Sequence, residues 1–306
     1  MKNQFLVVIL LVVIASWSCN NRIEKSDSNP SFMKNIKFNH LYVVIDDTTY
    51  NYLFDSLQFF NDFSLNYEDT VDAGDESWTG KYLMGIHNYL EIFKPNGYEG
   101  AKMGDLGLGF MTNKIGTLDS LYSYWKANLD SVTIENRDFV DENGDTTSWF
   151  RFISIPNIDS LPVDPWLMEN TREHMISTGF TDNDLLNEIE FYEYSKTYTA
   201  NRYDISPDSI IYNKLFDKVT SLHLTLSEKE LNYLKQYLDD FGFTEKDGIF
   251  SGEDFDIKYS ISESRHFILN QIDFSLLDTL ESEKYSFRSL DLLVNGDKAS
   301  LKFTYK

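Results

Sequence analysis

The strongest constraint on the fold is an order of predicted elements that recurs along the chain. A first strand is predicted over residues 38–45, where β-branched and aromatic residues alternate with others. Apolar residues at helical spacing follow over residues 46–62. Three more strands are predicted over residues 63–68, 78–85 and 89–93. The first part of the chain therefore has the order β-α-β-β-β.

The same order begins again in the next part of the chain. A glycine-rich strand is predicted over residues 106–112, and Thr117 can begin a helix that ends near residue 129. Strands are then predicted over residues 132–140, 148–155 and 165–169. Between the first two of these lies Asn143-Gly144, a dipeptide typical of a type I′ hairpin turn.

A third and more divergent unit is predicted in the last part of the chain. Helices over residues 182–196 and 207–216 lead into a strand over residues 219–226. Ser227 and Glu230 form the capping-box pattern at the start of the next helix. Further strands are predicted over residues 255–261, 267–274, 287–294 and 299–305, with Asn295-Gly296 as a second hairpin signal.

The N-terminus has the three parts of a secretory signal peptide. Lys2 is basic, residues 5–15 are apolar, and small serines lie close to Cys19. The apolar run is shorter than the roughly 20 residues that a membrane-spanning helix needs. We expect residues 1–18 to be a lipoprotein signal peptide and Cys19, the only cysteine, to carry a lipid anchor. The alternative is a buried apolar helix that ends in an unpaired cysteine.

The composition of the chain excludes some classes of function and favours others. Residues 20–31 contain one aliphatic residue, so a flexible tether is predicted over residues 19–35. The chain has 49 acidic and 27 basic residues, a formal net charge of -22, and lacks the basic footprint that nucleic-acid binding requires. These features favour a bacterial cell-envelope protein, lipid-anchored to a membrane on the periplasmic or cell-surface side and with no nucleic-acid partner.

Three short segments and the repeated units carry a resemblance to a known superfamily. His40 lies near the start of the first strand, Glu91 lies within Tyr-Leu-Glu-Ile-Phe, and Asp105 lies within Gly-Asp-Leu-Gly. Together they resemble the vicinal oxygen chelate superfamily, which includes glyoxalase I, extradiol dioxygenases and bleomycin-resistance proteins. Within it, the chain is similar to uncharacterised glyoxalase-like bacterial lipoproteins. The resemblance covers roughly residues 36 to 175.

This resemblance implies an α+β fold of paired β-α-β-β-β modules with an additional C-terminal α+β portion. The glyoxalase-like domain would cover residues 36–178, followed by a helical connector over residues 179–218. The C-terminal α+β module would cover residues 219–306, where a third β-α-β-β-β unit is an open alternative. His223 in this module echoes His40, but no matching Glu is evident, and we expect it to be structural.

The resemblance also implies a divalent-metal site. The first and last strands of each unit would supply the ligands His40, Glu91, Asp105 and Glu169. One imidazole and three carboxylates suit Mn, Ni, Fe or Zn. Glu91 or Glu169 would then be the catalytic residue that moves a proton.

Each implied ligand has a structural alternative. His40 can be a hydrogen-bonded strand histidine, and Asp105 replaces the histidine of the family and is equally typical of a turn. Glu173 and His174 compete with Glu169 for the fourth position.

Two functions therefore remain open. The first is a metal-free lipoprotein that uses an aromatic-lined sheet to bind a small ligand or a partner without catalysis. The second is a divalent-metal-dependent lyase, isomerase or dioxygenase that acts on a small oxygen-bearing substrate. Convergence of the four implied ligands would favour the second.

Overall fold

The computed structural model describes residues 30–55, 62–73, 76–129, 131–140, 145–157, 159–203, 214–263 and 267–304. The predicted signal peptide, Cys19 and the dipeptide Asn143-Gly144 lie outside these ranges. Residues Ser31–Lys306 form one compact unit. No helix in the described ranges has the length and apolar character that crossing a membrane requires.

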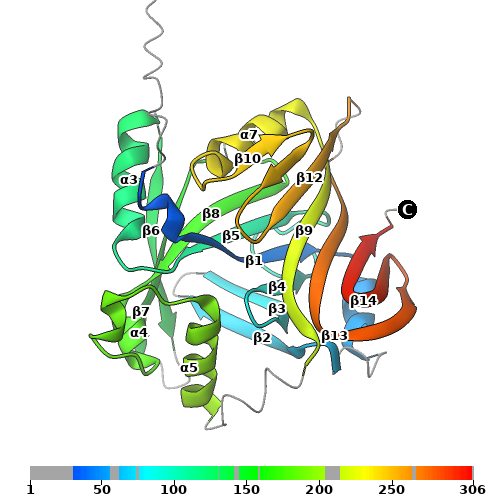
Figure 1. Cartoon of the computed structure of the whole chain (residues 1–306), viewed down its shortest axis with the longest axis horizontal. Helices are drawn as coiled ribbons and strands as arrows, with labels where there is room; N and C mark the ends of the chain where they lie inside the picture. The colour runs from blue at the N-terminus through cyan, green and yellow to red at the C-terminus, as the bar shows by residue number, and fades with distance from the viewer. Residues whose placement is uncertain are drawn as a thin grey trace, which may run out of the picture. The chain divides into compact units, whose positions relative to one another are not determined.

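Within those ranges, eight strands form the first sheet (Figure 1). The first unit consists of β1 (Ile36–Val44), α1 (Asp47–Asp55), β2 (Leu65–Ala73), β3 (Glu76–Met84) and β4 (Tyr89–Phe93). The second unit consists of β5 (Leu106–Thr112), α3 (Thr117–Asn128), β6 (Thr133–Val140), β7 (Thr146–Ser154) and β8 (Val163–Asn170). The strand order is β2-β3-β4-β1-β5-β8-β7-β6. The predicted α+β fold of paired β-α-β-β-β modules is confirmed.

The two units meet at their first strands. β1 is antiparallel to β5, while β4 runs parallel to β1 and β8 runs parallel to β5. Residues of β1 and β5 alternate between the two faces of the sheet, as the twofold period of a strand requires. On one face, Leu41, Leu108 and Phe110 are buried in the same core as Leu118 and Trp125 of α3. The other face is therefore left for the polar and aromatic residues of these strands.

The C-terminal portion repeats the topology of the first unit. It consists of β9 (Phe216–Leu226), α7 (Glu228–Leu238), β10 (Thr244–Lys246), β11 (Ile249–Ser251), β12 (Asp256–Ile261), β13 (Ile268–Phe287) and β14 (Leu290–Phe303). Among the described residues the order of this second sheet is β10-β11-β12-β9-β13-β14, with β12 parallel to β9. Its first five elements thus have the order and pairing of the first unit.

The helix α7 joins the C-terminal portion to the first sheet. The predicted capping box is present, because Ser227 and Glu230 exchange hydrogen bonds at the helix start. Trp125 of α3 packs edge-on against Tyr237 of α7 with ring centroids 5.4 Å apart. The Nε1 of Trp125 donates a hydrogen bond to Asp240, just after α7, at 2.9 Å. The two sheets therefore share one hydrophobic core.

The predicted hairpin at Asn295-Gly296 is wrong. Gly296 lies inside β14, opposite Leu280 of β13, at a shift in the pairing register. Its φ of 66° suits a β-bulge, in which glycine is also favoured. The chain instead reverses between the end of β13 and Leu290, with Arg288 at φ 47°.

The connector also differs from the prediction. In place of one helix over residues 182–196, the chain forms α4 (Arg172–Ser177), the 3₁₀ turn η2 (Asp184–Leu186) and α5 (Phe191–Tyr203). Asp184 accepts hydrogen bonds from the backbone and hydroxyl of Thr181, at 2.8 and 2.6 Å, which favours a local turn over a helix. Residues 204–213, most of the other predicted helix, lie outside the described ranges.

Candidate functional site

The pairing of β1 with β4 brings His40 and Glu91 to one face of the first sheet. His40 is paired with Tyr89, and Tyr42 is paired with Glu91. Because alternate residues of a strand share a face, all four side chains belong to the same face. We call this face, which also carries Trp166 of β8, the His40 face.

Two glycines of β5 make room for the rings of β1. Gly109 is paired with His40 and Gly107 is paired with Tyr42. A Cβ atom at Gly109 would overlap the His40 ring, and one at Gly107 would overlap the Tyr42 ring. The glycine-rich strand seen in the sequence therefore lets both rings lie across the neighbouring strand.

His40 is enclosed by aromatic rings. It stacks on Tyr89 with centroids 4.6 Å apart, and Trp166 meets it edge-on at 5.3 Å. Its Nδ1 lies 2.8 Å from Oδ1 of Asn39, whose amide nitrogen is directed to the sulfur of Met111. Burial lowers the pKa of His40 to about 3, so the ring is neutral at pH 7. With the proton on Nδ1, its Nε2 is a hydrogen-bond acceptor.

Glu91 is also buried, with 8% of its surface exposed. Burial raises its pKa to about 8, although a hydrogen bond with the Tyr89 side chain partly opposes the shift. Its neighbours across the adjacent strands are Tyr82 and Tyr42. At neutral pH Glu91 is therefore mostly a carboxylic acid and can donate a hydrogen bond.

Further aromatic residues lie around His40 and Glu91. Trp78 of β3 stacks on Trp149 of β7 at 6.3 Å, so strands from the two units approach each other across the His40 face. The rings of Tyr89 and Phe191 also stack, with their centroids 5.7 Å apart. The helix α5 therefore covers the face at Tyr89 (Figure 1).

Asp105 and Glu169 have structural roles away from this pair. Asp105 precedes β5, and its carboxylate accepts a hydrogen bond from the backbone of Lys102 at 2.8 Å, as expected of the turn alternative. Glu169 accepts from the backbone of Leu118 and the hydroxyl of Thr112, both at 3.0 Å. Leu118 lies in the first turn of α3, so Glu169 stabilises the start of that helix.

The residues competing for the fourth ligand position are placed elsewhere as well. Glu173 is exposed on α4, and Nε2 of His174 lies 2.9 Å from the hydroxyl of Tyr194. Across the part of the chain that the structure describes, no three His, Cys, Asp or Glu residues are grouped so that they could hold a metal ion. The four-ligand set implied by the resemblance therefore does not fit the arrangement of these side chains.

The register of β5 and β8 identifies a residue that the sequence did not single out. Asp164 is paired with Gly107, which in turn is paired with Tyr42. Glu91, Tyr42, Gly107 and Asp164 thus form one row across four strands. Burial raises the pKa of Asp164, and Tyr233 of α7 donates a hydrogen bond to it at 3.1 Å. The sequence carries no signal for Asp164, because its place in this row depends on the pairing of β8 with β5.

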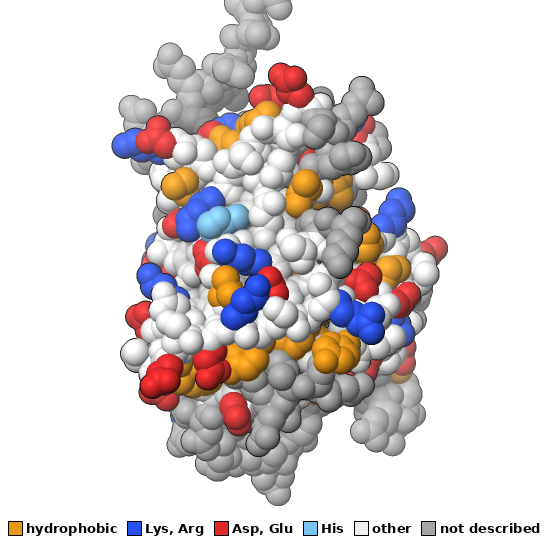
Figure 2. All heavy atoms as spheres, turned by 90° about the vertical axis from the view of Figure 1, so that its right-hand side faces the viewer, with side chains coloured by type: hydrophobic (Ala, Val, Ile, Leu, Met, Phe, Trp, Pro, Cys, Tyr) orange, Lys and Arg blue, Asp and Glu red, His pale blue; other side chains and the backbone are white. Residues whose placement is uncertain are grey.

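His223 belongs to a polar network on the second sheet. Its Nε2 lies 2.7 Å from Asp273, which also accepts from Ser221 at 2.7 Å and from Ser300 at 2.8 Å. These hydrogen bonds hold the pKa of Asp273 low, at about 2. On the face shown in Figure 2, acidic and basic side chains are interspersed.

No curated protein matches the chain. A hypothetical protein from Staphylococcus aureus is similar in structure, with 11% identity, a TM-score of 0.49, and coverage of 83% of this chain and 96% of that one. A 2,3-dioxygenase from Pseudomonas sp. KL28 has 10% identity, a TM-score of 0.41 and coverage of 88% and 92%. An extradiol ring-cleaving dioxygenase from B. fuscum has 11% identity, a TM-score of 0.33 and coverage of 74% and 53%. The model of a family of unknown function, DUF5829, matches residues 38–303, and the chain therefore belongs to this family.

Proposed function

We propose that this chain is a cell-envelope lipoprotein that binds a small uncharged molecule at the His40 face. Lipid on Cys19 would hold it to a membrane, and the binding would involve no catalysis. The observation that supports the ligand class is the neutral pair on neighbouring strands. Glu91 supplies a hydrogen-bond donor and Nε2 of His40 supplies an acceptor, inside an aromatic wall.

The chemistry of this pair selects its ligand. A charged molecule would lose its hydration among the buried rings without meeting an opposite charge, which is costly. A planar molecule with one acceptor and one donor, such as a phenol or a conjugated carbonyl compound, would satisfy both groups and stack on the rings. Because Phe191 stacks on Tyr89, the ligand would enter by taking the place of this ring.

A second candidate is a divalent-metal-dependent lyase, isomerase or dioxygenase acting on a small oxygen-bearing substrate. It is favoured by the presence of His40 and Glu91 on the first and last strands of one unit. The positions of Asp105 and Glu169 do not support it. We therefore rank it below ligand binding.

One experiment separates the two candidates. The full chain is purified in detergent without chelator or affinity-tag metal, beside a His40→Ala, Glu91→Ala double variant and an exposed-site control, Glu99→Ala. Metal content is measured after exposure to Mn, Ni, Fe and Zn, and small molecules released on denaturation are identified by mass spectrometry.

We expect the parent and the control to release the same organic molecule and the double variant to release none. Near-stoichiometric metal that is lost only in the double variant would instead support the metal-dependent enzyme. A parent that holds neither a molecule nor a metal, and whose melting temperature no phenol or conjugated carbonyl compound raises, would refute binding at the His40 face.

A further inference from the structure

The helix α5 covers the His40 face without belonging to the hydrophobic core that the two sheets share. None of the described residues of α5 is part of that core, whereas α3 and α7 each contribute several. Among the side chains of α5 that the structure describes, only Ser195 is buried. A helix that buries few apolar side chains loses little free energy when it leaves its neighbours. The packing therefore allows α5 to open while the rest of the fold stays intact.

Two polar contacts hold the start and the middle of α5 against the residues that follow β5 and β8. The hydroxyl of Tyr194 lies 2.9 Å from Nε2 of His174. Just before the helix, Glu190 accepts a hydrogen bond from Nδ2 of Asn113 at 2.7 Å. The backbone nitrogen of Ile189 donates to the carbonyl oxygen of the same asparagine, also at 2.7 Å. Breaking either side-chain contact should therefore favour the open helix.

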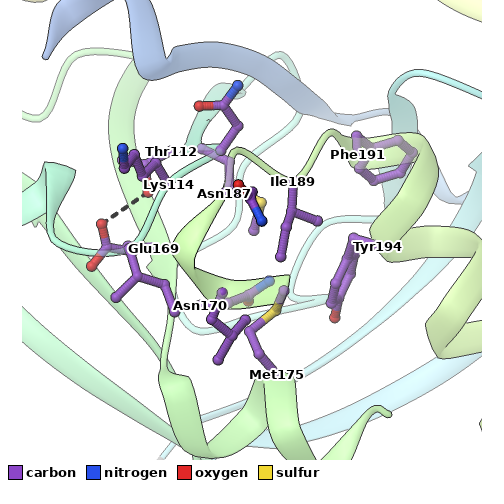
Figure 3. Close-up of a pocket in the computed structure, with 13 residues that line it drawn as sticks. Thr112, Lys114, Glu169, Asn170, Met175, Asn187, Ile189, Phe191 and Tyr194 are labelled. Carbon is purple, nitrogen blue, oxygen red and sulfur yellow. Dashed lines mark hydrogen bonds between the residues drawn. The ribbon is translucent and has the colours of Figure 1, made fainter. Parts of the chain in front are cut away.

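The packing beneath the start of α5 is incomplete. Figure 3 shows Ile189, Phe191 and Tyr194 on one side of a small cavity and Glu169 on the other. The cavity has room for about 30 Å³, which is enough for water but not for a ring. Nearby, Oδ1 of the buried Asn113 has no hydrogen-bond partner among the described residues. A buried acceptor without a partner costs free energy, so hydration of this amide when α5 opens would offset part of the cost of opening.

The first ring of α5 lies on the aromatic wall of the His40 face. Phe191 stacks on Tyr89 with ring centroids 5.7 Å apart and an angle of 20° between the rings. Tyr89 in turn stacks on His40 at 4.6 Å. A planar ligand that stacks on Tyr89 in place of Phe191 needs the surface that this ring covers. Phe191 and the ligand therefore exclude each other.

We propose that α5, with Ile189 and Glu190 before it, is a lid on the His40 face, and that Phe191 occupies the ligand's position on Tyr89 until the lid opens. This inference rests on the proposed binding at the His40 face. Because only the open lid leaves room for the ligand, the apparent affinity is lowered in proportion to the fraction of molecules that are open. By the same linkage, a bound ligand holds the lid open.

Hydrogen exchange tests the lid without any ligand. The full chain in detergent is transferred to deuterated buffer, and peptides from α5, α3 and α7 are followed by mass spectrometry. We expect the amides of α5 to exchange at least about tenfold faster than those of α3 and α7, because they become exposed without unfolding of the core.

Variants at the polar contacts test what holds the lid closed. Tyr194→Phe removes the hydroxyl that meets His174 and should speed exchange about tenfold in α5 alone. Glu190→Ala removes the side-chain partner of Asn113 and tests the same opening if the first variant does not fold. Tyr122→Phe, which removes a hydroxyl from α3, is the matched control and should exchange as the parent does.

Binding of phenol tests the position of Phe191. The dissociation constant is measured by ligand-observed NMR titration of the full chain in detergent, with detergent alone as the blank. Phe191→Ala should bind phenol at least about fivefold more tightly than the parent, because this ring no longer competes for Tyr89. Saturating phenol should also speed exchange in α5 of the parent and leave α3 and α7 unchanged.

The outcomes separate the lid from the proposed ligand. Exchange of α5 in step with α3 and α7, in the parent and in folded Tyr194→Phe, would overturn the lid. Phenol binding that Phe191→Ala leaves unchanged or weakens would overturn the competition for Tyr89. If phenol binds neither protein while α5 still exchanges ahead of α3 and α7, the lid is supported and the ligand class proposed for the His40 face is wrong.

Discussion

Glu91→Gln should change how the stability of this protein depends on pH. In the folded chain burial raises the pKa of Glu91 from an ordinary value of 4.5 to about 8. Between these two values the folded state binds more protons at this position than the unfolded state does. The free energy of unfolding therefore falls as pH rises through this window. Gln has nearly the same shape and cannot ionise, so the variant should lack this contribution.

The size of the effect follows from the two pKa values. Integrated from pH 4.5 to pH 8, the Glu91 contribution to the free energy of unfolding decreases by about 4 kcal/mol. Burial lowers the pKa of His40 to about 3 and that of His174 to about 4. Both histidines therefore change the free energy of unfolding mainly below pH 6.5, where they make it rise as pH rises. Between pH 6.5 and pH 8 the parent should therefore lose about 1.5 kcal/mol relative to the variant.

Urea unfolding of the full chain at several pH values between 5 and 8 measures this difference. Subtracting the free energy of unfolding of Glu91→Gln from that of the parent removes contributions that both proteins share. Glu99→Gln, at an exposed position, is the control and should follow the parent. A difference between parent and Glu91→Gln that stays constant with pH would refute the argument that Glu91 is protonated in the folded protein.

Three further predictions concern single residues. Gly109→Ala should destabilise the fold by about 1–3 kcal/mol in urea unfolding, because the added methyl group overlaps the His40 ring; unchanged stability would contradict the close approach. Glu169→Ala should cost about 2 kcal/mol, since the start of α3 and Arg151 lose their carboxylate, and should leave the metal content as in the parent. If Glu169→Ala lost metal that the parent binds, Glu169 would again be a candidate metal ligand. Cys19→Ala should abolish incorporation of labelled fatty acid and release the chain from the membrane fraction; a variant that stays labelled would exclude Cys19 as the lipid site.

Local patterns in the sequence were sufficient for most of the fold. Periodicity and capping act between residues a few positions apart, so the order β-α-β-β-β and the capping box at Ser227 could be predicted from the chain. The turn at Asn295-Gly296 could not. A glycine after asparagine suits a hairpin and a bulge alike, and the pairing of Gly296 with Leu280 across two long strands decided between them.

The candidate site shows the same division. The resemblance carried by the sequence named His40 and Glu91, and the parallel pairing of β1 with β4 in the structure places both on one face. The second unit was different, since Glu169 and Trp166 are an odd number of residues apart on β8 and so belong to opposite faces of the sheet. Only the pairing of β8 with β5 placed Asp164 in the row with Glu91.

The sequence by itself therefore determined which elements form and in what order, because those choices depend on neighbours along the chain. The tertiary structure decided which carboxylates share a face of the sheet and which ionisable groups are protonated at neutral pH. Both depend on strand register and burial, which are set by residues far apart in the sequence. The neutral state of Glu91 and His40 is the clearest case, since the same side chains in water would each have an ordinary pKa.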